Sequence, residues 1–197
     1  MSTYFDTLTT NYTQVPVTDD GIATLPFTGA TDGVVKLFDL LGSIAFTIVQ
    51  NDMNGNLKKI RDRYELNTAA NSTLEKLVIN EKDEKKRVAT EGLLWLMRGL
   101  EFTSVALRRL LDNPDEEVGA AFTKAYGDTL KKYHGLIAKG AFTVAMKACP
   151  LRDDFFKKLG EDQERVVELF NIWLTALEGL VARLKTFYTS GGYDKGF

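Results

Sequence analysis

Apolar residues recur at helical spacing along most of the chain, and the alternating pattern of a β-strand is absent throughout. The pattern therefore predicts an all-α fold. The clearest helix covers 88–111, VATEGLLWLMRGLEFTSVALRRLL, and Asn113-Pro114 ends it. Other helices are expected at 34–49, from there to Tyr64, from 74 onward behind the capping cluster Asn71-Ser72-Thr73, at 117–130 and 131–148 as two helices or one broken helix, at 152–159, and at 163–188.

Residues 1–197 are expected to form a single domain, with an irregular N-terminal segment at 1–25 and a loose tail at 189–197. The net charge of −2 lacks the positive excess that is typical of nucleic-acid-binding proteins, so no nucleic-acid partner is expected. The single cysteine, Cys149, is interpreted as a small buried hydrophobe. The chain shows no secretory signal pattern and no run of about 18 apolar residues, so we expect a cytoplasmic protein that meets membranes only at their surface.

A polar stripe follows the apolar run of the first predicted helix, in the segment QNDMNGNLKKIRDR at 50–63. Asp52, Asn56 and Lys59 fall within an arc of about 60° if the segment is helical. One interpretation is a solvated helix face. The other is recognition of a sugar, because a carboxylate accepts hydrogen bonds from hydroxyl groups, whereas an amide and an ammonium donate to sugar oxygens.

Trp95 has Gly92 three residues before it and Gly99 four residues after it, on the same helical face. The glycines favour either close helix packing or an indole left uncovered as a platform for a ring. His134, the only histidine, cannot form a multi-histidine metal site, but it can hydrogen-bond an amide oxygen. No nucleophile elbow, Walker loop or dinucleotide fingerprint is present. We therefore expect no catalytic residue, metal or cofactor, and recognition of a sugar joined to an amide-bearing lipid.

Three segments, FDLLGSIAFTIVQNDMNGNLKKI, ATEGLLWLMRGLEFT and TLKKYHGLIAKGAFTVAMKACPLRDDF, resemble the glycolipid transfer protein family, and they occur in the family order. The second is especially similar to fungal members, including the heterokaryon-incompatibility protein. The resemblance implies a two-layer bundle of about eight helices with a hydrophobic lipid pocket between the layers. It also implies a monomer that binds glycosphingolipids of the glucosylceramide or galactosylceramide type and transfers them between membranes through transient contact with the membrane surface.

The resemblance assigns headgroup roles to five residues. Asp52, Asn56 and Lys59 would bind the sugar hydroxyls, and Asp52 would also accept from the ceramide amide. Trp95 would stack on the sugar ring, and His134 would donate to the ceramide carbonyl. The lipid chains would meet the apolar residues Leu37, Phe38, Leu41, Ala45, Phe46, Phe142 and Phe155.

Residue differences between branches of the family indicate which headgroup is expected. The branch that carries ceramide-1-phosphate replaces the Asn by Lys and the Trp by Arg, so Asn56 and Trp95 favour a neutral sugar. Arg63 extends the stripe by one turn, and Tyr193 corresponds to a tyrosine that approaches the headgroup in some members. Mammalian members carry a Trp at the membrane surface where this chain has Leu136.

Three alternatives stay open at this point. The chain could be a glycolipid sensor or scaffold that signals through a protein partner. It could carry ceramide-1-phosphate, which the retained residues disfavour. It could also hydrolyse glycolipids, which would require a second carboxylate facing Asp52 across the sugar, and the sequence does not place one.

Overall fold

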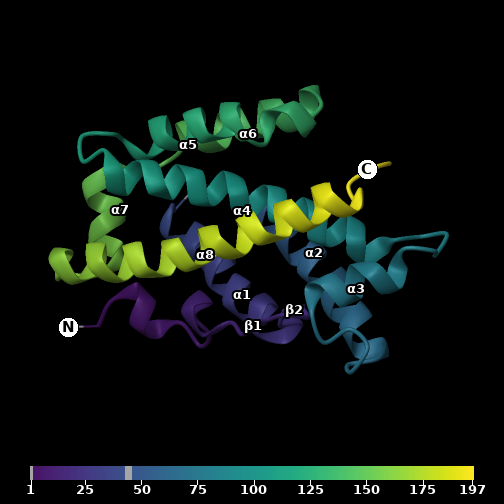
Figure 1. Ribbon diagram of the computed structural model, residues 1–197. Helices are drawn as coiled ribbons and strands as arrows, with labels where there is room; N and C mark the ends of the chain where they lie inside the picture. Colours follow the sequence, from purple (N-terminus) through teal and green to yellow (C-terminus); the bar gives the residue numbers. More distant parts are fainter. Residues whose placement is uncertain (1, 43–45) are drawn as a thin grey trace.

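The computed structural model describes residues 2–42 and 46–197, and most of this part of the chain is helical (Figure 1). It confirms the predicted all-α fold. Its α-helices are α1 (Thr24–Leu40), α2 (Thr47–Leu66), α3 (Leu74–Glu81), α4 (Val88–Asp112), α5 (Val118–Asp128), α6 (Leu136–Lys147), α7 (Arg152–Leu159) and α8 (Gln163–Gly191). Short 3-10 helices lie at Tyr4–Thr7, Tyr12–Gln14 and Lys131–Tyr133, and the antiparallel strands β1 (Val17–Thr18) and β2 (Gly21–Ile22) form a small hairpin.

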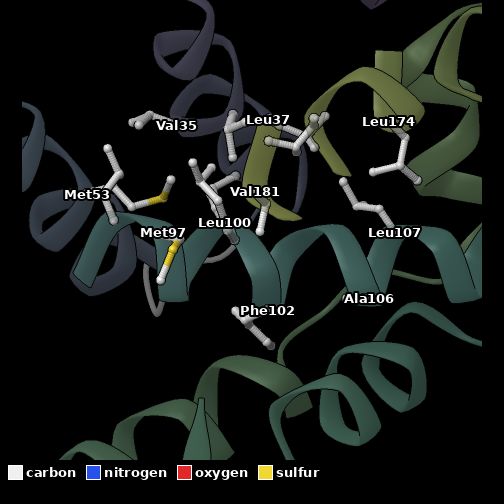
Figure 2. Packing of buried hydrophobic residues seen from close by; sticks show 14 of the residues in the cluster. Val35, Leu37, Met53, Met97, Leu100, Phe102, Ala106, Leu107, Leu174 and Val181 are labelled. Carbon is white, nitrogen blue, oxygen red and sulfur yellow. The ribbon is translucent and has the colours of Figure 1, made fainter. Parts of the chain in front are cut away.

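Helix α4 lies at the centre of the bundle, because apolar residues occupy most of its circumference. It packs against α2 and α8 on one side and against α5 on the other, while α6 lies against α5 (Figure 1). Figure 2 shows Leu37 of α1 and Val181 of α8 near Leu100 of α4, with Phe102 pointing from the opposite side of α4 toward the other layer. The hydrophobic core therefore extends from one layer to the other through α4.

The helix predicted at 34–49 is wrong as a single element. Helix α1 begins at Thr24, since Pro26 lies in its first turn, where the backbone N–H groups have no partner within the helix. It ends at Leu40, and Gly42 has a φ of 68°, a left-handed conformation that terminates helices. The polar stripe belongs to a second helix, α2, that begins at Thr47.

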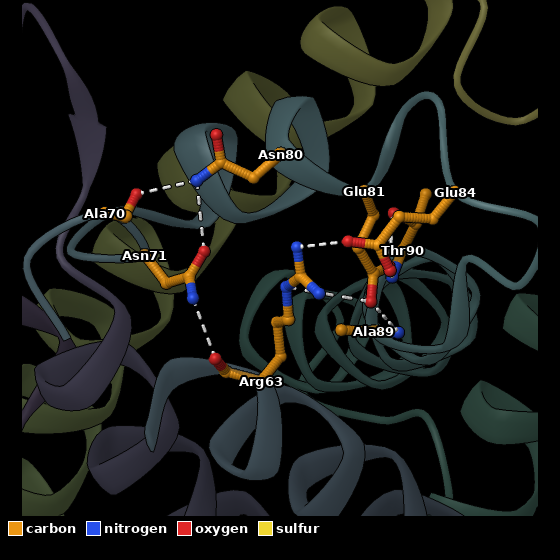
Figure 3. Close-up of polar contacts among 8 residues, drawn as sticks. All are labelled: Arg63, Ala70, Asn71, Asn80, Glu81, Glu84, Ala89 and Thr90. Atoms are coloured by element: carbon orange, nitrogen blue, oxygen red, sulfur yellow. Dashed lines mark hydrogen bonds and ion pairs between the residues drawn. The ribbon is translucent and has the colours of Figure 1, made fainter. Parts of the chain in front are cut away.

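A buried carboxylate holds the start of α4 (Figure 3). Helix α4 has no side-chain cap of its own. Instead Glu81, at the end of α3, accepts hydrogen bonds from the Ala89 amide (3.1 Å), the Thr90 amide (2.7 Å) and the Thr90 hydroxyl (2.8 Å). This fixes the turn of α4 that precedes Trp95.

The structure moves the start of the tail that was predicted at 189–197. Helix α8 continues to Gly191. Tyr193 then stacks on Phe187, with ring centroids 4.8 Å apart, and Arg87 donates to the carbonyl of Lys195. The end of the chain thus packs back against α8 and the segment before α4.

Candidate functional site

Helix α2 places the three stripe residues on one face. The Nδ2 of Asn56 donates to Oδ2 of Asp52 over 3.2 Å, a contact between residues one helical turn apart. Asn56 is only 4% exposed, whereas Asp52 is exposed and Lys59 is half-buried. The amide therefore orients the carboxylate at the edge of a recess, which a purely solvated helix face would not require.

The two glycines beside Trp95 have different roles. A Cβ at Gly92 would lie 3.0 Å from Cδ and 3.1 Å from Cβ of Lys59, so this glycine allows α4 to approach α2 closely. A Cβ at Gly99 would meet nothing within 4 Å. Each interpretation of the glycines thus applies to one of them: Gly92 serves helix packing, and Gly99 leaves space beside the indole.

His134 reaches the same region from the other layer, just after the 3-10 turn Lys131–Tyr133. Its ring stacks near Trp95, with centroids 6.2 Å apart and planes 24° apart. Its Nδ1 lies 3.1 Å from the hydroxyl of Tyr126. With Tyr126 donating to Nδ1, the imidazole hydrogen resides on Nε2, and this hydrogen is available to an acceptor.

These residues line one cavity of about 380 Å³, within the range of small-ligand pockets. At its polar end lie Asp52, Asn56, Lys59, Glu91, Trp95 and His134. Its apolar wall includes Ile48, Val49, Met53, Phe102, Leu130, Ala138, Ala141 and Phe142. The cavity therefore joins a hydrogen-bonding surface to an apolar one.

Burial shifts the titration of two groups in the cavity. Although the residue as a whole stays exposed, partial enclosure of its carboxyl at the cavity wall raises the pKa of Asp52 above its ordinary 3.8, and the positive charge of Lys59, and then that of protonated His134, opposes this shift. Burial lowers the pKa of His134 below 6.5, with the Asp52 charge opposing this shift. At neutral pH the imidazole is therefore uncharged and presents one N–H donor.

Arg98 supports the indole from the side of α4. This arginine is 7% exposed, and its guanidinium carbon lies 3.8 Å from the ring centroid of Tyr133 and 4.8 Å from that of Trp95. Both contacts are within cation–π range. They connect the Trp95 platform to the turn that carries His134.

Arg63 and Tyr193, the two further headgroup candidates, do not line this cavity. Arg63 turns toward α3 and the loop after it, 2.8 Å from Glu84 and 4.0 Å from Glu81 (Figure 3). Tyr193 packs on Phe187. The guanidinium of Arg63 is thus committed to carboxylates of the protein itself.

Of the residues expected to meet lipid chains, only Phe142 lines the cavity. Ala45 lies outside the described residues. The others are at most 3% exposed and sit in closed core: Leu37, Phe38, Leu41, Phe46 and Phe155. The predicted chain pocket is therefore packed shut except at its mouth.

A row of phenylalanines leads from the cavity into this core. Phe142 contacts Phe102 with ring centroids 5.7 Å apart, and Phe102 contacts Phe122 at 5.6 Å. Phe122 in turn lies 6.4 Å from Phe46, which lies 5.7 Å from Phe38. The apolar wall of the cavity is thus continuous with the residues predicted to meet lipid chains.

Residues 22–161 match the family described as Glycolipid transfer protein (GLTP). The chain belongs to this family. It is 49% identical over 188 residues to a glycolipid transfer protein of Aureobasidium melanogenum, covering 95% of this chain and 94% of that protein. It is 32% identical to human pleckstrin homology domain-containing family A member 8, covering 98% of this chain but only 40% of that longer protein.

Solved structures of the glycolipid transfer protein family share the fold. HET-C2, described as a fungal glycolipid transfer protein, matches with a TM-score of 0.91 at 40% identity, over 95% of this chain and 97% of that one. FAPP2, described as selecting simple glycosphingolipids with this fold, matches with a TM-score of 0.88 at 31% identity, over 98% of each chain. Mouse ceramide-1-phosphate transfer protein matches at 22% identity with a TM-score of 0.86, which shows the fold alone.

Sequence reasoning missed three residues in or beside this cavity: Glu91, Arg98 and Tyr126. Glu91 and Arg98 lie four residues before and three residues after Trp95, so helical spacing could have placed both beside the indole. Tyr126 comes from α5 and reaches His134 only through the turn between the helices. No local pattern signals that contact.

Proposed function

We propose that this chain binds a glycosphingolipid and carries it between membranes. The sugar would occupy the polar end of the cavity, and the ceramide chains would extend along its apolar wall. The observation that supports this is the convergence of Asp52, Asn56, Lys59, Trp95 and His134 on one cavity with an apolar side. Each buried CH₂ of a ceramide chain stabilises the complex by about 0.8 kcal/mol, which offsets the loss of the bilayer environment.

The roles of the headgroup residues follow from their chemistry. The Asp52 carboxylate would accept hydrogen bonds from sugar hydroxyls and the ceramide amide, and Asn56 and Lys59 would donate to sugar oxygens. The Trp95 face would contact the apolar side of the sugar ring. The Nε2–H of His134 would donate to the ceramide carbonyl. Neutral donors and acceptors of this kind suit a glucosyl or galactosyl headgroup.

The test is vesicle-to-vesicle transfer of fluorescent glucosylceramide and ceramide-1-phosphate side by side. We expect the wild-type chain to move the glucosyl lipid in preference. Trp95→Ala and Asp52→Val should abolish transfer while helicity, measured by circular dichroism, is retained. Asp62→Val is the matched control, because Asp62 lies on the same helix in an exposed pair with Lys58. Full transfer by either site variant would refute the assignment.

Membrane contact would be made by the first turn of α6. Leu136 and Ile137 are 87% and 92% exposed, and they follow His134 directly after one glycine. We expect the double variant Leu136→Ser/Ile137→Ser to lose vesicle binding in a flotation assay and to slow transfer, with unchanged thermal stability. Leu66→Ser, at a residue 76% exposed on the far end of α2, should leave binding intact. Equal loss in both variants would refute a localised contact.

The proposed activity is carriage without hydrolysis. Glu91 adds a second carboxylate to the cavity of Asp52, an arrangement that glycoside hydrolases also use. We expect glycolipid recovered after long incubation with the protein to be intact by thin-layer chromatography. Release of free ceramide in the presence of wild-type chain, absent with Glu91→Gln, would show hydrolysis instead.

A further inference from the structure

Glu91 occupies the first turn of α4, four residues before Trp95, and it lines the cavity together with Asp52 and Lys59. Acidic residues in a first helical turn often stabilise free backbone N–H groups. Here the buried Glu81 already accepts from the amides of Ala89 and Thr90. Helix capping therefore does not explain the position of Glu91.

The half-buried carboxylate of Glu91 has no hydrogen-bond donor or ion-pair partner within 2–42 and 46–197, and the same holds for the ammonium of Lys59. Both groups are thus left for a ligand in the cavity. The charged residues that line the cavity are two acids, Asp52 and Glu91, against the single cation Lys59, while burial keeps His134 neutral at neutral pH. The lining of the cavity thus holds one more carboxylate than cations, and the guanidinium of Arg98, beside Trp95, is not part of this lining.

Resting on the proposed function, we infer that Glu91 is a specificity-determining residue that favours a neutral sugar headgroup and rejects a sulfated or phosphorylated one. A neutral hexose brings hydroxyl groups that donate to the additional carboxylate. A sulfate or phosphate group brings only acceptor oxygens and negative charge, which two carboxylates in a recessed site repel. The exclusion of anionic headgroups therefore depends on Glu91 of α4 as well as on Asp52 in the stripe on α2.

The experiment compares transfer of galactosylceramide with transfer of its 3-O-sulfated derivative, two lipids that differ by one sulfate. Wild-type chain should prefer the neutral lipid. Glu91→Gln should raise the ratio of sulfated to neutral transfer about tenfold, equivalent to about 1.4 kcal/mol, and Glu91→Lys should raise it further. Asp112→Asn removes one carboxylate at the exposed end of the same helix and should leave the ratio unchanged. Added salt should weaken the wild-type preference by screening.

Each outcome has a defined meaning. Wild-type chain that moves neither lipid would overturn the proposed function and this inference with it. Wild-type chain that moves galactosylceramide, with a ratio that neither Glu91 variant changes, would overturn the inference alone. An equal rise in Asp112→Asn would assign the effect to overall charge and would also overturn it. Thermal unfolding of each variant shows that the transfer rates belong to folded protein.

Discussion

Gly92 and Gly99 flank Trp95 on one face of α4, yet a methyl group added at each meets different surroundings. At Gly99 the new Cβ would have no neighbour within 4 Å. Glycine in a helix interior costs up to about 1 kcal/mol relative to alanine. We therefore expect Gly99→Ala to stabilise the fold by about 1 kcal/mol, which raises the melting temperature by about 2–4 °C for a chain of this length.

At Gly92 the same gain in helix propensity meets an opposing cost. The new Cβ would lie 3.0 Å from Cδ of Lys59 and 3.4 Å from the backbone oxygen of Asn56. Overpacking of this kind costs about 1–3 kcal/mol. Gly92→Ala should therefore be destabilising by about 1 kcal/mol net, and it should displace the stripe residues of α2.

Thermal unfolding by circular dichroism and glycolipid transfer should be measured on both variants. Gly99→Ala should be more stable than wild type yet slower in transfer, because its methyl group projects into the cavity. Gly92→Ala should be less stable and also slower. A destabilised Gly99→Ala would show that the space beside Trp95 is filled. A stabilised Gly92→Ala would show that the side chain of Lys59 moves aside freely, and would refute the packing argument.

Titration and capping give two more expectations. Because burial lowers the pKa of His134 below 6.5 and raises that of Asp52 above 3.8, sugar binding should persist as the pH falls through 6.5 and be lost as Asp52 takes up a proton. Binding isotherms of a short-chain glucosylceramide across this range would check it, and a midpoint at 6.5 would contradict it. Glu81→Ala should destabilise the fold by about 3 kcal/mol, since two amides and a hydroxyl lose their acceptor. Melting curves should show Glu84→Ala, in a partly exposed ion pair, costing less than about 1 kcal/mol; equal losses would refute the cap.

The sequence predicts best those helices that have both a helical repeat of apolar residues and capping or helix-breaking residues at their ends. The cluster before α3 works as predicted, since Thr73 caps it by accepting from the amide of Lys76. Asn113-Pro114 likewise coincides with the end of α4 at Asp112. The prediction of one helix at 34–49 failed because a segment that is apolar on all sides shows no helical periodicity, so its hydrophobicity could not reveal that α1 ends at Leu40, two residues before Gly42. The glycine itself was the available signal.

The residues of the site also fall into two groups: those that the sequence alone brings together and those that only the folded structure brings together. The stripe on α2 needs only helical spacing, so the sequence alone is enough to bring Asp52, Asn56 and Lys59 together. Trp95 and His134 join them only in three dimensions, and it was the family resemblance that linked the segments. Arg63 was misplaced for a physical reason: it continues the sequence spacing, but the ends of α2 and α3 bring it against Glu84. Residue spacing within one helix cannot predict an ion pair with a carboxylate from another segment of the chain.

The polar end of the cavity is open and the row of phenylalanines is closely packed, because polar groups are stabilised by contact with water and apolar rings are not. Burying a carboxylate, an ammonium or an imidazole without partners costs free energy, so the polar end of the cavity stays accessible to water. The phenylalanines from Phe102 to Phe38 have the opposite preference and pack on one another. If a lipid chain enters between them, contacts among rings are exchanged for contacts between rings and CH₂ groups, and no apolar surface is left in water. A chain site built in this way would need no preformed hole, and its residues would be indistinguishable from ordinary core until a lipid separated them.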